Sequence, residues 1–184
     1  MKRLFDIMAS CGALIFLLPL MALVALAIII DSRGGALFLQ ERTGLNGKPF
    51  KIFKFRTMVP NVENKGPLLA VRNDLRVTRV GKFLRRWSLD ELPQLFNIIK
   101  GDMSLIGPRP EIPALEAEWS LWQRKVLQVR PGLSGFAQIM GRDDLPIDTK
   151  LRLDSYYIRH MSFCFDLWII WRTLVIVLTG RGAF

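Results

Sequence analysis

The longest hydrophobic pattern lies at the start of the chain, where residues 7–30 contain no charged side chain. A continuous helix of this length would extend about 36 Å, which is enough to cross a hydrocarbon core of ~30 Å. Pro19 lies near the middle, where proline removes a helical hydrogen bond and kinks the helix. The segment therefore predicts either one straight transmembrane span or a re-entrant helix that turns back at Pro19.

The charges around this segment favour a re-entrant helix. Lys2 and Arg3 precede it, and residues 31–184 carry 24 basic against 15 acidic side chains, a net charge of +9. The positive-inside rule places both flanks in the cytoplasm. A cleaved signal peptide is a third reading, because small residues in 22–27 resemble a cleavage site. Asp6 and the continuation of the apolar run beyond that site disagree with cleavage.

The turn signal Leu45–Lys48 and the aromatic and basic residues of 50–55 predict a β-hairpin within 36–58. Proline, asparagine and glycine in 60–75 indicate a loop. Helical periodicity and punctuation by proline and glycine predict five further helices and one glycine-rich loop. The helices are expected at 81–87, from Asp90 onward, at 114–129, at 146–157 and at 163–178, and the loop at 130–141.

The last predicted helix, 163–178, is strongly apolar but would be only about 24 Å long, which is short for a span. Asp166 and Arg172 interrupt a face that carries Trp168 and Trp171. Paired tryptophans with few charges are typical of a helix lying in the membrane interface. An ordinary buried core helix is the alternative.

Composition narrows the class of protein. The 184 residues have a net charge of +10 and are 51% hydrophobic, a combination that suggests anionic groups met at a membrane surface. No zinc-finger or RNA-binding motif is present, so nucleic acid is not an expected partner. With only Cys11, Cys164 and His160 available, a zinc site or disulfide framework is not expected. Any metal would be bound by oxygen, as magnesium or calcium is.

Asp90 and Glu91 are adjacent carboxylates between a basic run, 79–87, and an apolar run. One reading is a capping box from Ser88 to Glu91, but Pro93 would then break a helical hydrogen bond. A helix that starts at Asp90 avoids this conflict. Either way the pair is expected at a helix N-terminus, where the helix dipole, together with Arg85 and Arg86, should keep both carboxylates ionised.

The same environment would bind a phosphate. An ionised carboxylate beside a phosphoryl group can form an acyl phosphate, and magnesium bridging Asp90, Glu91 and a diphosphate would offset the repulsion between anions. Arg109 lies between Pro108 and Pro110, which restrict the backbone on both sides of it. An arginine whose backbone is fixed in this way presents a guanidinium that is suited to a diphosphate. The alternatives are simple helix capping by the acidic pair and a solvated surface arginine.

Four stretches together resemble the bacterial monotopic phosphoglycosyl transferases, also called the bacterial sugar transferase family. They are FKIFKFRTM, RVGKFLRRWSLDELPQLFNIIKGDMSLIGPRP, VRPGLSGFAQ and LDSYYIRHMSFCFDLWIIWRT, in this order along nearly the whole chain. The second stretch is the most specific. The chain resembles the minimal form of the family, which has one membrane segment and a catalytic domain.

The resemblance implies a magnesium-dependent ping-pong reaction that transfers a phosphosugar from a UDP-sugar to undecaprenyl phosphate and releases UMP. The product would begin the assembly of a surface glycoconjugate. Asp90 would be the nucleophile, and Glu91 would assist through the metal or as a base. Arg85 and Arg109 match positions expected to bind phosphate. Arg130 and Gln138 match positions in a loop expected to line the substrate site.

The resemblance also implies a re-entrant helix broken at Pro19, although Leu18 replaces the small polar residue that often precedes this proline. The expected fold is α/β but mainly helical, with a membrane helix at 1–31 and a catalytic domain at 32–184. This domain, with its interfacial amphipathic helices, would lie on the cytoplasmic face of the bacterial inner membrane, against anionic lipid headgroups. A homo-oligomer is compatible with the sequence. A basic membrane-anchored binding module without catalysis is the competing hypothesis.

Overall fold

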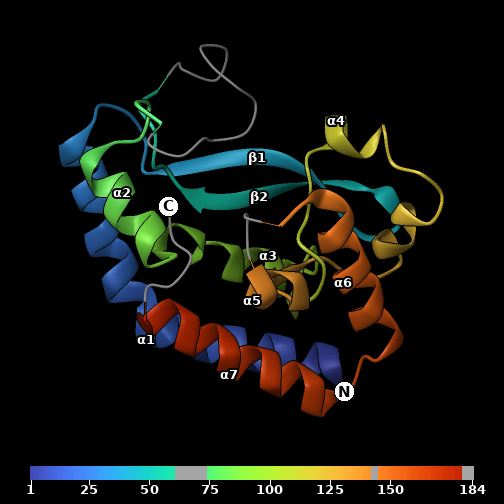
Figure 1. Cartoon of the computed structure of the whole chain (residues 1–184). Coiled ribbons are helices and arrows are strands. Elements are labelled where there is room, and N and C mark those ends of the chain that lie inside the picture. The colour runs from blue at the N-terminus through green and yellow to red at the C-terminus, as the bar shows by residue number, and fades with distance from the viewer. Residues whose placement is uncertain (61–73, 142–144, 180–184) are drawn as a thin grey trace.

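A computed structural model describes residues 1–60, 74–141 and 145–179 of the chain. A β-hairpin lies along one side of the molecule, and α1 and α7 lie along the opposite side, with shorter helices between them (Figure 1). The helices and strands have the following bounds: α1 Lys2–Asp31, β1 Leu37–Thr43, β2 Pro49–Phe55, α2 Arg79–Arg86, α3 Gln94–Lys100, β3 Ser104–Ile106, α4 Pro113–Glu116, β4 Gly132–Ser134, α5 Phe136–Gly141, α6 Ile147–Arg159 and α7 Phe163–Thr179. The described part is mainly helical, as expected, and contains two small sheets, of which only the β1–β2 hairpin was expected.

α1 remains helical through Pro19, and its axis bends between a first half beside α7 and a second half that runs toward α2 (Figure 1). The polar residues of its first turns bind the rest of the protein. Arg3 donates to the carbonyl oxygens of Ile98 at 2.6 Å and Ile99 at 3.0 Å. The buried Asp6 carboxylate accepts from the Ser104 hydroxyl at 2.8 Å. The start of α1 is therefore fixed to α3 and β3.

The other end of α1 is fixed to the same body. The Asp31 carboxylate accepts from the backbone N–H of Val80 at 3.1 Å. The Arg56 guanidinium donates to the carbonyl oxygens of Ser32 at 2.8 Å and Arg33 at 2.7 Å. The Arg56 bonds satisfy the carbonyl groups of the two residues that follow α1. Both ends of α1 are thus bonded to the same folded body.

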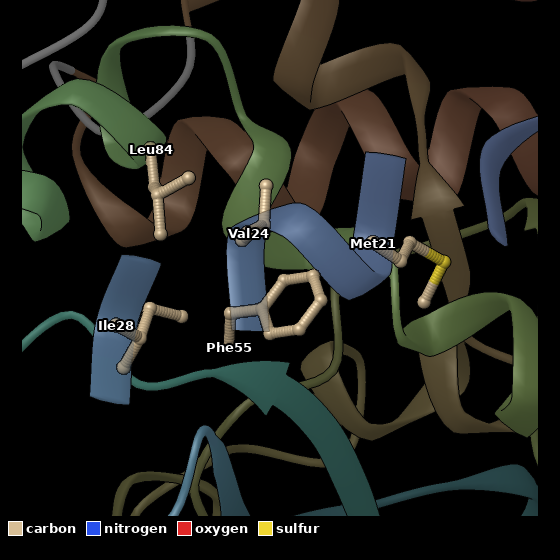
Figure 2. Close-up of a cluster of buried hydrophobic side chains, with 5 residues drawn as sticks. All are labelled: Met21, Val24, Ile28, Phe55 and Leu84. Atoms are coloured by element: carbon tan, nitrogen blue, oxygen red, sulfur yellow. The ribbon is translucent and has the colours of Figure 1, made fainter. Parts of the chain in front are cut away.

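The second half of α1 contributes to a hydrophobic core. Met21, Val24 and Ile28 pack with Phe55 at the end of β2 and Leu84 of α2 (Figure 2). The other side of α1 is exposed and apolar, and α1 is the single helix in the described ranges that is long and apolar enough to cross a membrane. Its exposed large apolar side chains are Leu4, Met8, Ile15, Phe16, Leu18, Leu20, Leu23, Leu26, Ile29 and Ile30.

The β-hairpin is confirmed. β1 and β2 are antiparallel, with Leu37 opposite Phe55 and Thr43 opposite Pro49. The predicted turn forms because Asn46 and Gly47 adopt positive φ angles of 56° and 76°, which these residue types tolerate. The predicted loop at 60–75 falls largely on 61–73, outside the described residues.

The prediction of a plain loop at 130–141 is wrong. β4 pairs in parallel with β3, with Ser104 opposite Gly132 and Ile106 opposite Ser134, and α5 follows. Gly132, in the predicted loop, lies so close to the chain after β3 that a Cβ atom on it would be 2.1 Å from the Gly107 backbone nitrogen. The glycines that suggested a loop instead permit close backbone approach between distant segments.

The prediction of one helix at 114–129 is also wrong. α4 ends at Glu116, and a 3₁₀ helix follows at Gln123–Gln128. Between them the Gln123 side-chain oxygen accepts from the Ser120 backbone N–H at 2.7 Å and from its hydroxyl at 2.9 Å. Such local side-chain bonds compete with helical ones, while Trp119 and Val126 pack into a core with Leu151.

The last two predicted helices are confirmed as α6 and α7. α7 buries Asp166 and Ile169 against the protein and leaves Trp168, Trp171 and several aliphatic side chains exposed. Phe5 and Phe163 meet edge to face, with ring centroids 5.2 Å apart, and Lys2 pairs with Asp166 at 2.6 Å. α7 therefore lies beside the start of α1, and both helices present apolar side chains outward.

Candidate active site

The acidic pair lies in a 3₁₀ turn, Leu89–Glu91, that immediately precedes α3. Ser88 enters this turn with a left-handed backbone (φ 53°, ψ 24°) and makes no side-chain cap, so the capping box does not form. α3 begins after Pro93 rather than at Asp90, because proline is well tolerated at a helix start and poorly tolerated inside one. The pair thus lies before the N-terminal end of α3, as expected, but outside the helix itself.

Glu91 is held between two cations that come from distant parts of the chain. Its Oε1 atom is 2.9 Å from Lys54 Nζ and 3.4 Å from Arg109 Nη1. Lys54 belongs to β2, and Arg109 belongs to the loop after β3. The Glu91 and Lys54 side chains are only 18% and 16% exposed, so the contact is screened less by water than a surface ion pair.

Asp90 has a different environment, in which burial and a neighbouring anion oppose the stabilisation of its charge that was expected from the helix dipole and the arginines. Burial raises the pKa of Asp90, and repulsion from Glu91 raises this pKa further. Lys54 and Arg85 oppose the shift without reversing it. A carboxylate that is poorly solvated and close to a second anion is a strong candidate for chemistry or for cation binding.

Arg85 lies beside the pair and extends from the end of α2. Its Nε atom donates to the Thr57 hydroxyl at 2.9 Å, and burial lowers its pKa while the Asp90 charge raises it. Arg86 points elsewhere, over the Trp87 ring at 5.7 Å. The structure therefore brings Arg85 and Arg109 to the acidic pair but not Arg86.

A hollow opens beside Glu91, and its polar walls include three residues that sequence reasoning missed. Lys54, Arg42 and Gln94 line it together with Glu91 and Arg109. The Gln94 amide nitrogen is buried and has no hydrogen-bond partner among the described residues. The remaining lining residues are Ile52, Pro110, Gly132 and Leu133. Three cations and an unpaired amide donor would suit an anionic ligand.

A signal for one missed residue was present in the sequence. Lys51 and Lys54 are three positions apart in a strand, so they must point to opposite faces. Lys51 is exposed and Lys54 is half-buried, which places Lys54 on the face that packs toward α3. No comparable local signal marks Gln94, because its burial depends on packing from other segments.

The loop that carries Arg109 is supported from behind by Asp154 of α6. Burial raises the pKa of this carboxyl to about 7, while the backbone N–H groups of Ala137 and Arg109 stabilise its charged form. Asp154 is only 4% exposed. It therefore connects α6 to both α5 and the Arg109 loop and positions that arginine indirectly.

The other two sequence candidates lie away from the acidic pair. Arg130 is exposed and donates to the Gly101 carbonyl oxygen at 2.9 Å, at the C-terminal end of α3. Gln138 lies in α5, where its amide nitrogen donates to the Leu133 carbonyl oxygen at 3.2 Å. Leu133 lines the hollow beside Glu91, so Gln138 contacts a residue of the wall without lining the hollow itself. Their assignment to the substrate site stays a prediction.

The acidic pair fits a magnesium ion that is shared with a substrate phosphate. In the described ranges no group of three or more histidine, cysteine, aspartate or glutamate side chains could hold a metal. Magnesium, however, commonly uses one or two carboxylates and completes its shell with water and phosphate oxygens. A cation between Asp90 and Glu91 would also offset the burial and repulsion that raise the pKa of Asp90.

A sequence model described as "Bacterial sugar transferase" matches residues 1–180. The chain belongs to the bacterial sugar transferase family. A relative from Aeromonas hydrophila, named UDP-N-acetylgalactosamine-undecaprenyl-phosphate N-acetylgalactosaminephosphotransferase, is 43% identical over 99% of this chain and 44% of its own length. Another, from Komagataeibacter xylinus and named undecaprenyl-phosphate glucose phosphotransferase, is 44% identical over 100% of this chain and 37% of its own.

This bacterial sugar transferase family member spans less than half the length of those two relatives. A third relative has nearly the same extent as the chain. The exopolysaccharide production protein PSS of Rhizobium leguminosarum bv. phaseoli is 40% identical over 99% of this chain and 98% of its own. The family expected from the four sequence stretches is thus confirmed.

Proposed function

We propose that this protein transfers a phosphosugar from a UDP-sugar to undecaprenyl phosphate, giving a lipid diphosphate sugar and UMP. One observation carries the proposal. Asp90, a half-buried carboxylate with a raised pKa, lies beside Glu91, which two cations hold at the edge of a hollow suited to an anion. The names of the two longer relatives, which both include an undecaprenyl-phosphate sugar-phosphate transfer, support the reaction class.

In the first half-reaction, a carboxylate oxygen of Asp90 attacks the β-phosphorus of the UDP-sugar. The bond from that phosphorus to the bridging oxygen breaks, the oxygen leaves on UMP, and the phosphosugar remains on Asp90 as an acyl phosphate. Lys54, Arg42 and Arg109 would hold the diphosphate oxygens, because these cations line the hollow beside the pair. Partial burial leaves the Asp90 carboxylate less hydrated than a surface carboxylate, which favours attack.

In the second half-reaction, a phosphate oxygen of undecaprenyl phosphate attacks the same phosphorus. The acyl-phosphate bond breaks, Asp90 regains its carboxylate, and the new diphosphate joins the lipid to the sugar. Glu91 would accept a proton if the incoming phosphate carries one. Magnesium held by Asp90 and Glu91 would supply charge neutralisation for the phosphate oxygens.

As part of this function we also propose that α1 is re-entrant and lies in the cytoplasmic leaflet of the inner membrane. It is supported by the contacts at both ends of α1, where Arg3 binds α3 and Asp31 binds the start of α2. A straight span would put these ends on opposite sides of the bilayer. The exposed apolar faces of α1 and α7 would lie in the lipid, and the anionic acceptor would reach the site from the same surface.

UMP release tests the function directly. Detergent-solubilised protein is supplied with magnesium, undecaprenyl phosphate and a panel of UDP-sugars. We expect the wild-type protein to release UMP from at least one donor and Asp90→Asn to release none above background. Asp148→Asn, an exposed position on α6, is the matched control and should keep wild-type turnover. Removal of magnesium with EDTA should stop the reaction, and added magnesium should restore it.

Covalent labelling and topology extend this test. Without the lipid acceptor, a donor labelled in its sugar should leave label on the wild-type protein but not on Asp90→Asn. A folded wild-type protein that releases no UMP from any donor would favour the non-catalytic binding module. An epitope at the N-terminus should be protected from protease in intact spheroplasts, whereas its digestion would indicate a straight span.

A further inference from the structure

The face of α3 that packs toward β2 carries two buried amide side chains, Gln94 and Asn97, which are 2% and 0% exposed. They are three positions apart, a spacing that puts two side chains on the same side of a helix. The Asn97 amide has a structural role. Its oxygen accepts from the Phe53 backbone N–H at 2.9 Å, and its nitrogen donates to the Lys51 carbonyl oxygen at 2.8 Å. Asn97 therefore fixes β2 to α3 immediately before Lys54.

The Gln94 amide differs from that of Asn97. Its nitrogen is buried and has no hydrogen-bond partner in the described part of the chain, and the side chain lines the hollow beside Glu91. Leu92 and Pro93 have helical backbone angles, so Glu91 and Gln94 also lie on the same side. Because a buried donor without a partner costs free energy, a ligand oxygen that enters the hollow would recover that cost.

The cations that line this hollow already have partners. Glu91 Oε1 lies 2.9 Å from Lys54 Nζ and 3.4 Å from Arg109 Nη1, so a substrate oxygen must share both cations with Glu91 or compete for them. Among the described residues, the Gln94 nitrogen has no such bond to exchange before it donates. A donor that is already in place stabilises negative charge without the cost of reorganisation. Gln94 thus offers the hollow a donor that only a ligand or water can use.

The size of the hollow limits what Gln94 can contact. The hollow gives the centre of a water-sized group about 10 Å³, which is room for roughly one such group. A single phosphate oxygen has this size, whereas a whole phosphate, a sugar ring or a base does not fit. A substrate phosphate would therefore lie at the opening of the hollow and place one oxygen inside it.

We propose that Gln94 is a further catalytic residue, whose amide nitrogen donates a hydrogen bond to one non-bridging oxygen of the phosphoryl group that Asp90 attacks. This inference rests on the proposed function. Negative charge is spread over the oxygens of that group while the bond to the leaving oxygen breaks and the bond to the attacking oxygen forms. Gln94 keeps its proton throughout, and no bond to its atoms forms or breaks. The same phosphorus reacts in both half-reactions, so the same donor serves both.

The test measures kcat and KM for UMP release by the full chain with Gln94→Met and Gln94→Glu. Methionine has a similar length but no N–H donor, and glutamate replaces the donor by an anion. Gln128→Met is the matched control, because Gln128 is exposed and does not line the hollow. The donors are the best UDP-sugar and its two diastereomers that carry sulfur in place of one non-bridging β-oxygen. The melting temperature reports folding.

We expect kcat of Gln94→Met to fall about 30-fold with KM within about 3-fold of the wild type, since the donor acts on charge in the transition state. Gln94→Glu should lose more activity, because its carboxylate would repel the phosphoryl group. The melting temperature of Gln94→Met should equal or exceed that of the wild type, because a buried amide without a partner has been removed. Gln128→Met should behave as the wild type.

Sulfur substitution distinguishes a contact with the substrate from a structural effect. Sulfur accepts a hydrogen bond less well than oxygen, so the wild type should discriminate against the diastereomer that points its sulfur at Gln94. Gln94→Met should lose this discrimination, because it has no donor at that position. Its discrimination against the other diastereomer should stay at the wild-type level.

Two outcomes overturn the inference alone. If folded Gln94→Met turns over within about 3-fold of the wild type, the amide stabilises no charge in the reaction and bonds only water. If its activity falls while its discrimination against both sulfur-containing donors stays at the wild-type level, Gln94 acts through the structure and does not contact the phosphoryl group. A wild type that releases no UMP from any donor overturns the proposed function instead, and this inference with it.

Discussion

The two ends of α3 both gather cations, but they use them differently. At the N-terminal end, Lys54 and Arg109 bind the Glu91 side chain at 2.9 and 3.4 Å. At the C-terminal end, Arg3 donates to carbonyl oxygens of the last turn of α3, and Arg130 donates to the carbonyl oxygen of Gly101, the residue that ends the helix. A cation bound to a side chain at the edge of a hollow can change partners when substrate arrives. A cation that caps a helix cannot do so without weakening the fold.

The largest effect should follow from Arg109→Ala, which removes a cation from the site end. We expect kcat/KM for UMP release to fall about 100-fold, since loss of one charged group that stabilises the reacting phosphate costs on this scale. Arg109→Lys keeps the charge but not the planar fork and should recover part of the activity. Turnover by Arg109→Ala within about 3-fold of the wild type would contradict the assignment of Arg109 to the site.

A second effect concerns the support of the Arg109 loop by Asp154. The pKa of this carboxyl is about 7 in the folded protein, above its ordinary value of 3.8. Its contribution to stability is therefore full below pH ~4 and is lost as the pH rises through about 7. The wild-type melting temperature should fall between pH 5 and pH 8.

Asp154→Asn, which cannot ionise, should show a smaller fall in melting temperature over the same pH range. Asp148→Asn changes an exposed carboxylate on the same helix and should keep the wild-type profile. Of the charged neighbours of Asp154, Glu111 raises its pKa and Lys150 lowers it. Parallel profiles for Asp154→Asn and the wild type would show that another group governs the pH dependence.

A third effect belongs to the capped end of α3. Arg3→Ala removes three hydrogen bonds from a charged donor to carbonyl oxygens and should reduce the free energy of unfolding by about 2 kcal/mol, measured by thermal or chemical denaturation in detergent. Lys100→Ala is the control, because its ion pair with Asp102 involves a side chain that is 62% exposed and contributes little. If Arg3→Ala and Lys100→Ala reduced the free energy of unfolding equally, Arg3 would not have the special capping role assigned to it.

The smallest effect should come from Arg130→Ala. Arg130 is exposed and makes one hydrogen bond, to the Gly101 carbonyl oxygen. We expect activity within about 3-fold of the wild type and a loss of stability of ~1 kcal/mol or less. A 100-fold loss of UMP release from a folded variant would instead support the sequence-based assignment of Arg130 to the substrate site.

Local patterns predicted much of this fold. The Asn-Gly turn and the aromatic and basic residues after it predicted the β1–β2 hairpin, and helical periodicity predicted α6 and α7 close to their observed bounds. The acidic pair could be singled out because two carboxylates between a basic and an apolar run are chemically conspicuous. These features depend on residues near one another in the chain, which propensity and patterning describe.

Contacts between distant segments could not be predicted in the same way. The sequence by itself determined the apolar first helix, the hairpin, the net positive charge and the acidic pair, because each depends on composition or short-range pattern. Only the tertiary structure decided that β3 and β4 pair, that Lys54 and Arg109 meet Glu91, and that Arg130 caps the far end of α3. The physical reason is that burial arises from packing of segments remote in sequence. Such burial shifts the pKa of Asp90 and, among the described residues, leaves the Gln94 amide nitrogen without a partner.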